Sequence, residues 1–407
     1  MQQRLLSLML AALLSPSAMA GGLALYETST ANSALANAGA AARAQGAETI
    51  ASNPAGMTKL EGTQLQVNGG VVYGDLELDL DKGGNNGGNA LQTAPLGSVY
   101  MTHAINDQWV AGFGMFGSHG LGIDYGDGWD GRGYAQSAKL TGIAFAPSLA
   151  YRIDSNWSVG ASLIAMHGAL KSSLEVAAIS GGAIENYFPG REFSDSDWAY
   201  GASFGVLYEL DQHSRIGLSY FSELKWELED QLFDRVNLAG LGVDMMIPQT
   251  VTLSGYHQLN DQWALLASAN WQQWSRFGDI DVAYLRQNQT IDMHYKDTWH
   301  LSLGTQFDVS PALRLSSGIA YDSSAVDDAH RTVTLPMGEG WRWGLGASYQ
   351  LSPATKLEAS YTLAWLGDMS VHQMDKSSHP RLGRPEISGT YNNSYLNFFN
   401  IGVQHQF

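Results

Sequence analysis

The end of the chain alternates between apolar and polar side chains. One face of this stretch holds Tyr395, Phe399, Ile401, Val403 and Phe407, and the other holds Asn400, Gly402, Gln404 and Gln406. A period of two over about ten residues predicts a β-strand with one face in an apolar medium and the other in water. The last strand of a soluble β-sandwich also alternates in this way, so the rest of the chain has to distinguish the two.

Similar segments follow one another from Thr63 onward. A strand needs roughly nine to eleven residues to cross a bilayer, and most of these segments reach that length. The pattern predicts fourteen strands, at Thr63–Leu80, Ala94–Ile105, Trp109–Phe116, Lys139–Arg152, Trp157–Lys171, Asp197–Glu209, Arg215–Trp226, Gln249–Leu259, Trp263–Trp274, Asp297–Phe307, Leu313–Tyr321, Gly340–Tyr349, Lys356–Trp365 and Tyr395–Phe407.

The connections between these strands alternate in length. Short ones such as Asn106–Gln108 and Asn260–Gln262 are followed by long ones such as Gly117–Ala138 and Ser275–Lys296. Short periplasmic turns and long outer loops are typical of outer-membrane β-barrels. Tryptophans at both strand ends predict two interfacial girdles. They are Trp109, Trp157 and Trp263 after short turns, and Trp226, Trp274 and Trp365 before long loops.

The first twenty residues differ from the rest. Arg4, the apolar run Leu5–Leu14 and the sequence Ala18-Met19-Ala20 predict a secretory signal peptide at residues 1–20. No run of eighteen apolar residues follows, and the mean hydropathy of −0.14 fits an alternating pattern. The expected fold is therefore all-β, a 14-stranded antiparallel transmembrane β-barrel in the outer membrane of a Gram-negative bacterium.

The composition restricts the classes of partner that the protein is expected to have. The formal net charge is −17, which argues against nucleic acid, and the absence of cysteine excludes disulfides. We expect a monomer surrounded by outer-membrane lipid and lipopolysaccharide. Five acids in the predicted loops either bind divalent cations near lipopolysaccharide or form a solvated acidic surface. They are Asp124, Asp127, Asp130, Asp327 and Asp328.

Residues Gly21–Gly62 precede the first predicted strand and have a different character. They are rich in Ala, Gly, Ser and Asn, and Pro54 within Asn53-Pro54-Ala55 would interrupt a β-ladder. Alanine runs favour short helices. We predict that residues 21–62 form a hatch of short helices and turns in the lumen of a barrel built from residues 63–407. A disordered extension is the alternative.

Six short blocks occur in order along the mature chain. They are Ser52–Met57, Ile105–Trp109, Val206–Leu210, Leu253–Tyr256, Trp271–Ser275 and Gly318–Asp322. Together with the signal peptide and the terminal Phe407, they resemble the FadL/TodX family of outer-membrane transporters, and the first block looks like its Asn-Pro-Ala hatch motif. The resemblance implies a hatch-plugged barrel, passive uptake of hydrophobic molecules and a lateral route through a kinked third strand. It also implies that the strand ending at Phe407 is the signal for the barrel assembly machinery.

The third predicted strand contains residues that fit such a route. Trp109–Phe116 continues into Gly117-Ser118-His119-Gly120. Glycines inside a strand pattern mark bulges or bends. We predict that Gly117, Ser118, His119 and Gly120 form the lateral gate. The alternative is that Gly117 simply starts the following loop.

A fatty acid would need a cation for its carboxylate. The resemblance places a ligand-binding basic residue at Lys296, but Ala169 stands where the fatty-acid members carry an arginine. Arg342 is a candidate replacement, or else a lumen residue paired with Glu358. Long-chain fatty acids are the first expectation for the ligand. Aromatic or alkane hydrocarbons, favoured by the missing arginine, are the second.

No enzymatic activity and no cofactor are expected. Adjacent residues of a regular strand point to opposite faces, which would keep Ser118 and His119 from forming a catalytic pair. The 11 histidines lack metal-ligand spacing. Two further classes stay open. A general porin would need a charged constriction and no hatch, and a barrel lipid esterase would need turnover of lipid esters.

Overall fold

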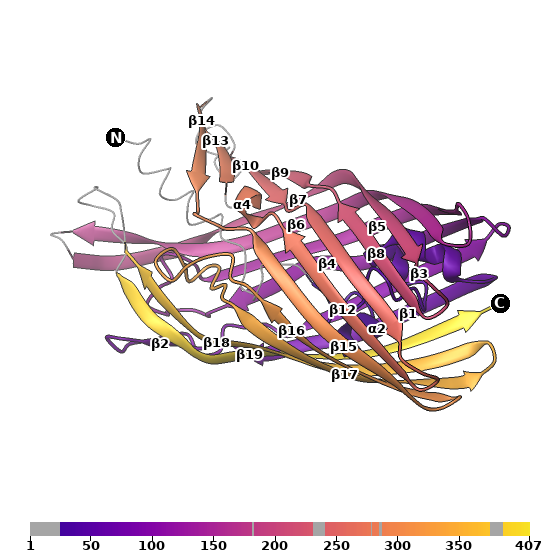
Figure 1. Cartoon of the computed structure of the whole chain (residues 1–407). Helices are drawn as coiled ribbons and strands as arrows, with labels where there is room; N and C mark the ends of the chain where they lie inside the picture. The colour runs from indigo at the N-terminus through magenta and orange to yellow at the C-terminus, as the bar shows by residue number, and fades with distance from the viewer. Residues whose placement is uncertain (1–24, 181–182, 231–240, 278, 285–286, 375–385) are drawn as a thin grey trace.

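The computed structural model describes residues 25–407 except 181–182, 231–240, 278, 285–286 and 375–385. Within these residues, fourteen antiparallel strands form a closed barrel, and β1 pairs with β19 at the seam (Figure 1). The barrel strands are β1 (Thr63–Asp75), β3 (Ala94–Ala104), β4 (Trp109–Asp124), β5 (Ser137–Arg152), β6 (Trp157–Ser180), β7 (Ala183–Glu209), β8 (Ser214–Phe221), β11 (Thr250–Gln258), β12 (Trp263–Gln272), β15 (Thr298–Ser310), β16 (Leu313–Asp322), β17 (Gly340–Ser352), β18 (Thr355–Gln373) and β19 (Ile387–Gln406).

The predicted barrel is confirmed, and each predicted strand corresponds to one barrel strand. Two predicted strands are divided, because β2 (Leu78–Leu80) and β9 (Leu224–Asp230) separate from β1 and β8. β2 pairs with the N-terminal end of β19, whereas β9 joins a second sheet in the order β14-β13-β10-β9. The other strands of that sheet are β10 (Leu241–Ile247), β13 (Asp279–Tyr284) and β14 (Gln287–Asp292). The described helices are too short and too polar to span a membrane, and the predicted signal peptide lies outside the described residues.

The alternation along β19 has the predicted orientation. Phe399, Ile401 and Val403 expose 43%, 70% and 45% of their surface on the outside of the barrel, whereas Asn400 between them is buried in the lumen. An apolar outer face and a polar lumen are what a membrane-spanning barrel requires. Closure of the ladder through β1 and β19 removes the two free edges that an open sheet of these strands would have.

Four short turns share one hydrogen-bonding pattern. In the first, Asn106 Oδ1 accepts hydrogen bonds from the backbone N–H groups of Gln108 and Trp109, both at 2.9 Å. Asp154, Asp211 and Asn260 do the same in their turns. Three aromatic pairs follow these turns on the outer face, with ring centroids 4.4–4.6 Å apart. They are Trp109–Tyr151, Trp157–Tyr208 and Trp263–Phe307. This is the predicted girdle at the short-turn end.

The predicted girdle at the long-loop end is wrong for two of its three residues. Trp365 is 40% exposed, but Trp226 and Trp274 are fully buried. Trp226 belongs to β9, which folds back over the lumen. Its indole lies against Gly142 and Gly168, where a Cβ atom would overlap it. Trp274 begins the short helix α4 (Trp274–Phe277), which also turns the chain inward.

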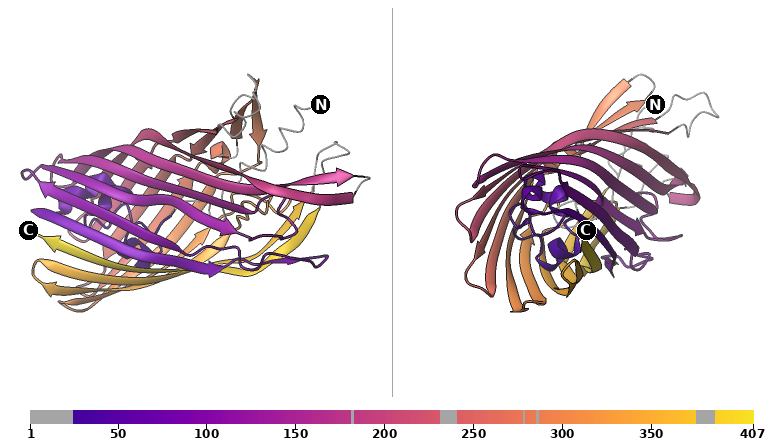
Figure 2. Two further views of the ribbon diagram at one scale, coloured as in Figure 1. Left: turned by 180° about the vertical axis from the view of Figure 1, so that it is seen from behind. Right: turned by 90° about the vertical axis from the view of Figure 1, so that its right-hand side faces the viewer.

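The described residues before β1 lie in the lumen. Seen from the end where the C-terminus lies, this indigo segment is enclosed by the ring of strands (Figure 2). It consists of α2 (Thr30–Ala34), α3 (Thr49–Ser52) and the 3₁₀ helix η1 (Pro54–Lys59). We call residues 25–62 the hatch segment. The short helices and turns predicted for this region are present in its described part.

Glycines on the inner wall let the hatch segment approach closely. Gly304, Gly318 and Gly344 are register partners on β15, β16 and β17. The backbone of α2 and Leu35 lies directly over Gly344 and Gly318, and side chains of the hatch segment lie over Gly304. A Cβ atom at any of the three would contact or overlap the hatch. The absence of side chains thus creates the space in which the hatch sits.

Candidate functional site

The ladder between β3 and β4 ends early. Their register partners run from Ala104↔Val110 to Ser98↔Phe116, although β3 stays paired with β1 as far as Ala94. Among the described residues, backbone pairing between β4 and the segment before β3 resumes only at the isolated bridge Leu91↔Ile123. The wall between these two points is interrupted on the β3 side of β4. We call this interruption the wall opening.

The predicted gate residues lie in the wall opening. β4 continues to Asp124, so Gly117 lies inside the strand and does not start a loop. The β4–β5 register shifts between Gly117 and His119, which marks a β-bulge. A Cβ atom at Gly117 would meet open space. The predicted bend position is therefore observed, and its role as a gate stays a prediction.

The hatch segment reaches the wall opening. The backbone N–H of Leu25 donates a 3.0 Å hydrogen bond to the carbonyl of Ser118, which has no partner on β3. Three residues further on, the carbonyl of Thr28 accepts hydrogen bonds from Ser98 Oγ and Tyr100 Oη, both at 2.8 Å. The start of the hatch segment therefore bridges β4 and β3 where the strands have parted.

The bulge corrects the predicted geometry of Ser118 and His119. Their side chains do not point to opposite faces, because His119 Nδ1 lies 3.1 Å from Ser118 Oγ. The displaced residue of a bulge breaks the regular alternation of a strand. Among the described residues, no carboxylate contacts His119 to complete a catalytic triad. Ser118 Oγ also lies 3.4 Å from the carbonyl of Gly142, so the hydroxyl is held in place.

A partly open pocket adjoins the wall opening. This inner cavity has a volume of about 130 Å³ and lies between the hatch segment and the barrel wall. Its lining includes Leu25, Phe116, Ser118, His119, Asn270 and Trp274. The inner cavity is the place in the described structure where aromatic and aliphatic side chains, many uncharged polar groups and the interrupted wall meet.

The predicted hatch motif fastens the hatch segment to the wall. Asn53 Nδ2 donates to the carbonyls of Ala41 at 2.7 Å and Val206 at 3.0 Å, and Asn53 Oδ1 accepts from the N–H of Ala55. Pro54 takes the first position of η1, where its missing N–H is harmless. The motif lies on the register pair Gly160↔Gly205, and a Cβ atom at Gly205 would overlap Asn53 Oδ1.

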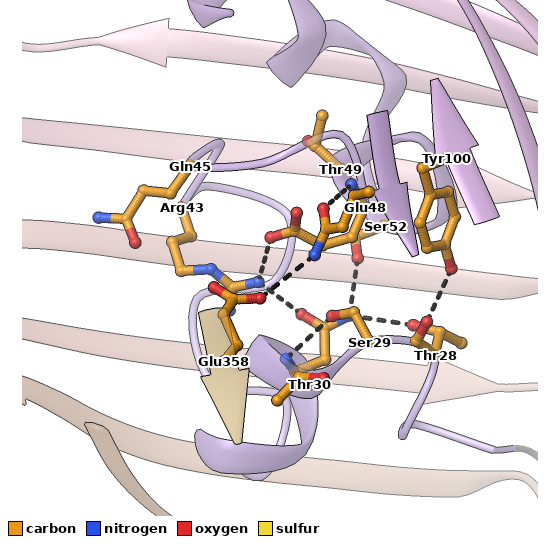
Figure 3. A network of polar contacts seen from close by, with 12 residues as sticks. Thr28, Ser29, Thr30, Arg43, Gln45, Glu48, Thr49, Ser52, Tyr100 and Glu358 are labelled. Carbon is orange, nitrogen blue, oxygen red and sulfur yellow. Dashed lines mark hydrogen bonds and ion pairs between the residues drawn. The ribbon is translucent and has the colours of Figure 1, made fainter. Parts of the chain in front are cut away.

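A buried polar network connects the parts of the hatch segment (Figure 3). Arg43 Nη2 donates to Asn32 Oδ1 and to Glu48 Oε1, both at 2.8 Å, and both charged side chains are almost completely buried. Asn32 Nδ2 also donates to Ser52 Oγ, and the N–H of Glu48 donates to Gln66 on β1. This ion pair was not predicted, because its only signal in the sequence is an Arg and a Glu within an Ala-rich stretch.

Arg342 is a buried lumen residue, and its predicted alternative partner is wrong. Its guanidinium donates to Asp322 at 2.7 Å and to Glu27 of the hatch segment at 2.6 Å. Glu358 instead pairs with Lys356 at 3.0 Å. Two carboxylates already neutralise Arg342, which leaves no net positive charge for a ligand. The neighbouring Tyr26 is stacked on a histidine ring, and burial raises the pKa of its hydroxyl.

Lys296 lies on the exposed outer rim. Its ammonium contacts Asp327 Oδ2 at 2.5 Å, and 59% of its side chain is exposed. Hydrogen bonds from His330 and then from Lys296 hold the pKa of Asp327 well below its ordinary value. Lys296 does not belong to the lining of the inner cavity, and its role in ligand binding stays a prediction.

The loop acids do not assemble into a metal site. No group of three or more His, Asp or Glu side chains suited to a metal ion occurs in the described part of the chain. Asp127 and Asp130 instead accept hydrogen bonds from Gln136 and from the backbone of Asn85.

At the C-terminus of the chain, the N–H of Phe407 donates to the carbonyl of Thr63 and extends the seam.

A closed barrel with an apolar outer face, an aromatic girdle and a lumen filled by its own N-terminal segment is an outer-membrane β-barrel with a hatch. The chain belongs to the family described as outer membrane protein transport protein (OMPP1/FadL/TodX), whose model matches residues 11–407. It lies in the outer membrane of a Gram-negative bacterium, as predicted.

The chain is also similar to individual relatives and solved structures. The chain is 27% identical over 370 residues to the long-chain fatty acid transport protein of Escherichia coli O6:H1, covering 80% of this chain and 82% of the relative. A FadL homologue of Pseudomonas aeruginosa shares the fold with a TM-score of 0.84 at 22% identity, over 95% and 100% of the two chains. The toluene transporter TbuX of Ralstonia pickettii has a TM-score of 0.67 at 17% identity, over 94% and 100%.

Proposed function

We propose that the protein takes up hydrophobic small molecules passively and releases them sideways into the membrane through the wall opening. The observation that supports this most is the interrupted β3–β4 ladder beside the inner cavity. Unpaired ladder groups are costly in lipid, so an interruption in the wall needs a purpose or a substitute partner. The hydrogen bond from Leu25 to Ser118 is such a partner.

Lateral release also fits the energetics of a hydrophobic solute. Each CH₂ group moved from an apolar site into water costs about 0.8 kcal/mol, so a sixteen-carbon chain loses on the order of 10 kcal/mol by entering the periplasm. Leaving into the bilayer avoids that loss. The periplasm-facing end of the lumen contains a second, charged cavity of about 450 Å³, which is unsuited to an apolar chain.

Long-chain fatty acids are the first candidate ligands, since the relative from Escherichia coli O6:H1 is named for transporting them. Neutral aromatic or alkane hydrocarbons are the second. Two observations favour the second candidate: Arg342 is already paired with two carboxylates, and Lys296 is paired with Asp327. We expect a monomer, assembled by the barrel assembly machinery, without turnover of lipid esters.

A removable crosslink tests the wall opening. The chain has no cysteine, so Gly97→Cys with Gly117→Cys places a thiol on each side of the opening, one step beyond the last β3–β4 pair. Closing this pair with a short thiol crosslinker should abolish uptake of oleate and toluene, and a reducible linker should allow uptake to recover. The control is Gly255→Cys with Ala267→Cys, a register pair elsewhere in the wall. Undiminished uptake by the closed Gly97/Gly117 pair would place the exit elsewhere.

A further inference from the structure

Charged and uncharged polar side chains line different parts of the lumen. The cavity at the short-turn end is lined by both signs of charge. These residues are Arg43, Lys59, Arg314, Lys356, Glu48, Glu61, Asp308 and Glu358. The described lining of the inner cavity contains no Lys, Arg, Asp or Glu. Since charges are common elsewhere in the same lumen, their absence here is a property of this cavity.

The inner cavity combines an apolar part with neutral hydrogen-bonding groups. Phe116, Phe221 and Trp274 contribute rings, while Thr252 and Asn270 contribute a hydroxyl and an amide. An ionised carboxylate placed here would lose its water without gaining an opposite charge, which is strongly unfavourable. An uncharged molecule avoids that cost.

One polar group in this lining lacks a partner. Asn270 Nδ2 donates to Thr252 Oγ1 at 2.6 Å, but Asn270 Oδ1 has no hydrogen-bond partner among the described residues. The residue is only 4% exposed. A buried acceptor without a donor is unfavourable, so a ligand that supplies an O–H group gains more from this lining than one that does not.

The volume of the inner cavity indicates the size of the ligand that it suits. The inner cavity holds about 130 Å³, and an apolar protein cavity of about 150 Å³ accommodates one benzene ring. Resting on the proposed uptake function, we propose that the inner cavity binds a small uncharged ring that carries a hydroxyl group, such as a phenol, and that the hydroxyl donates to Asn270 Oδ1. Asn270 is then a specificity-determining residue, because it favours the hydroxylated ring over the plain hydrocarbon.

Three matched ligands test this assignment. Toluene, p-cresol and p-toluate share a methylated ring and differ in carrying no polar group, a neutral hydroxyl or a carboxylate. Binding to the purified full-length protein in detergent at pH 7 can be measured by titration calorimetry, with empty micelles subtracted. We expect p-cresol to bind about fivefold more tightly than toluene, as one added hydrogen bond allows. Binding of p-toluate should be weaker than both.

Variants of Asn270 identify the group responsible. Asn270→Leu should weaken p-cresol to the level of toluene and leave toluene unchanged, whereas Asn270→Asp, which keeps an acceptor, should retain the preference for p-cresol. Gln306→Leu in the charged cavity is the control and should change neither ligand. A heat-modifiable band on gels verifies that each variant is folded.

Two results would overturn the assignment. One is binding of p-toluate as tight as that of p-cresol, and the other is an unchanged preference for p-cresol in Asn270→Leu. If cells expressing the wild type still take up toluene and p-cresol in those cases, only the head-group assignment fails. If wild-type cells take up neither compound, the proposed uptake function fails with it.

Discussion

Asn53 holds the hatch segment to the barrel through the hydrogen bond from its Nδ2 to the carbonyl of Val206, while its bonds to Ala41 and Ala55 stay within the hatch segment. The close approach depends on Gly205, because a side chain there would occupy the position of the amide oxygen. The two residues are therefore a matched pair, one on the hatch segment and one on the wall. Sequence alone pointed to Asn53 through the resemblance, whereas the role of Gly205 depends on strand register.

Asn53→Ala should loosen the hatch segment. The variant loses three hydrogen bonds, each worth about 1 kcal/mol, and leaves the carbonyl of Val206 without its donor. Gly205→Val should have the same effect by steric overlap. In planar bilayers both variants should conduct small ions more than the wild type. Gly255→Val, whose Cβ position is open, is the control, and equal conductance in all four proteins would contradict the anchoring role.

The pairing of Lys296 with Asp327 gives a two-sided prediction. If Lys296 binds the carboxylate of a fatty acid, Lys296→Ala should weaken oleate binding about tenfold, since a charge-assisted hydrogen bond contributes roughly 1.5–3 kcal/mol. Asp327→Asn should free the ammonium and strengthen oleate binding. Because the pKa of Asp327 is lowered, the wild-type pair stays ionised well into the acid range, so mild acidification does not replace the mutation. Unchanged oleate binding in both variants would favour a neutral ligand.

Arg342 shows why side-chain partners were harder to predict than strands. Glu358 seemed a suitable partner because it lies on the neighbouring strand with the same inward orientation. In the actual register Arg342 is opposite Ala364, and Glu358 is opposite Ser348. The observed partners are Asp322 on β16 and Glu27, which lies 315 residues away in the hatch segment. Alternation fixes which face a residue occupies, but not which distant segment fills the lumen opposite it.

At the level of elements, β4 differs from its neighbours by losing one partner while keeping the other. Its pairing with β5 extends to Asp124↔Ser137, yet its pairing with β3 ends at Phe116. The glycines of Gly117–Gly120 predicted a bend from the sequence. The lost partner could not be predicted, because β3 itself continues to Ala94 and only the strand register shows that β4 leaves it after Phe116.

Replacing Gly117 and Gly120 with valine tests the bend. A Cβ atom at either position would overlap no neighbouring atom, so the double variant should fold, while β-branched side chains stiffen the strand and obstruct the wall opening. Uptake of hydrophobic compounds by cells should fall several-fold, whereas ligand binding to the purified protein should persist. A double variant that folds and transports at the wild-type rate would exclude these residues as the gate.

The barrel as a whole was predictable, because alternation and turn length repeat along the chain, and aromatic girdle residues follow three of the short turns. Trp226 and Trp274 were misplaced because a tryptophan at a strand end looks the same whether the next residues continue outward or fold inward. β9 and α4 fold inward there. The apolar interior at the long-loop end is therefore a tertiary feature with no periodic signal.

Removing residues 21–62 should convert the protein into an open pore. The hatch segment occupies the lumen (Figure 2), and the barrel ladder closes without it through β1 and β19. We expect the truncated protein to fold and to show a markedly higher single-channel conductance in planar bilayers. Wild-type conductance in the folded truncation would mean that the segment is not a plug.

Deleting Phe407 should impair assembly. The residue is 74% exposed beside the seam, so its loss removes little folding energy, yet the resemblance assigns recognition to this strand. We expect less heat-modifiable, folded protein in the outer membrane but normal refolding in detergent. Gln406→Ala is the adjacent control. Normal membrane levels of the deletion variant would show that recognition uses other residues.

The hatch segment joins the barrel at the first residue of β1, beside the chain's other end. A pull on the hatch segment toward the periplasm would therefore act along the axis of β1 and load the seam in shear. All the β1–β19 pairs from Gln64↔Gln406 to Asp75↔Tyr395 would resist together, whereas a force across the strands would break them one at a time. We expect the contacts between the hatch segment and the wall to break before the β1–β19 ladder does. Mechanically, the plug can be dislodged while the wall that surrounds it stays closed.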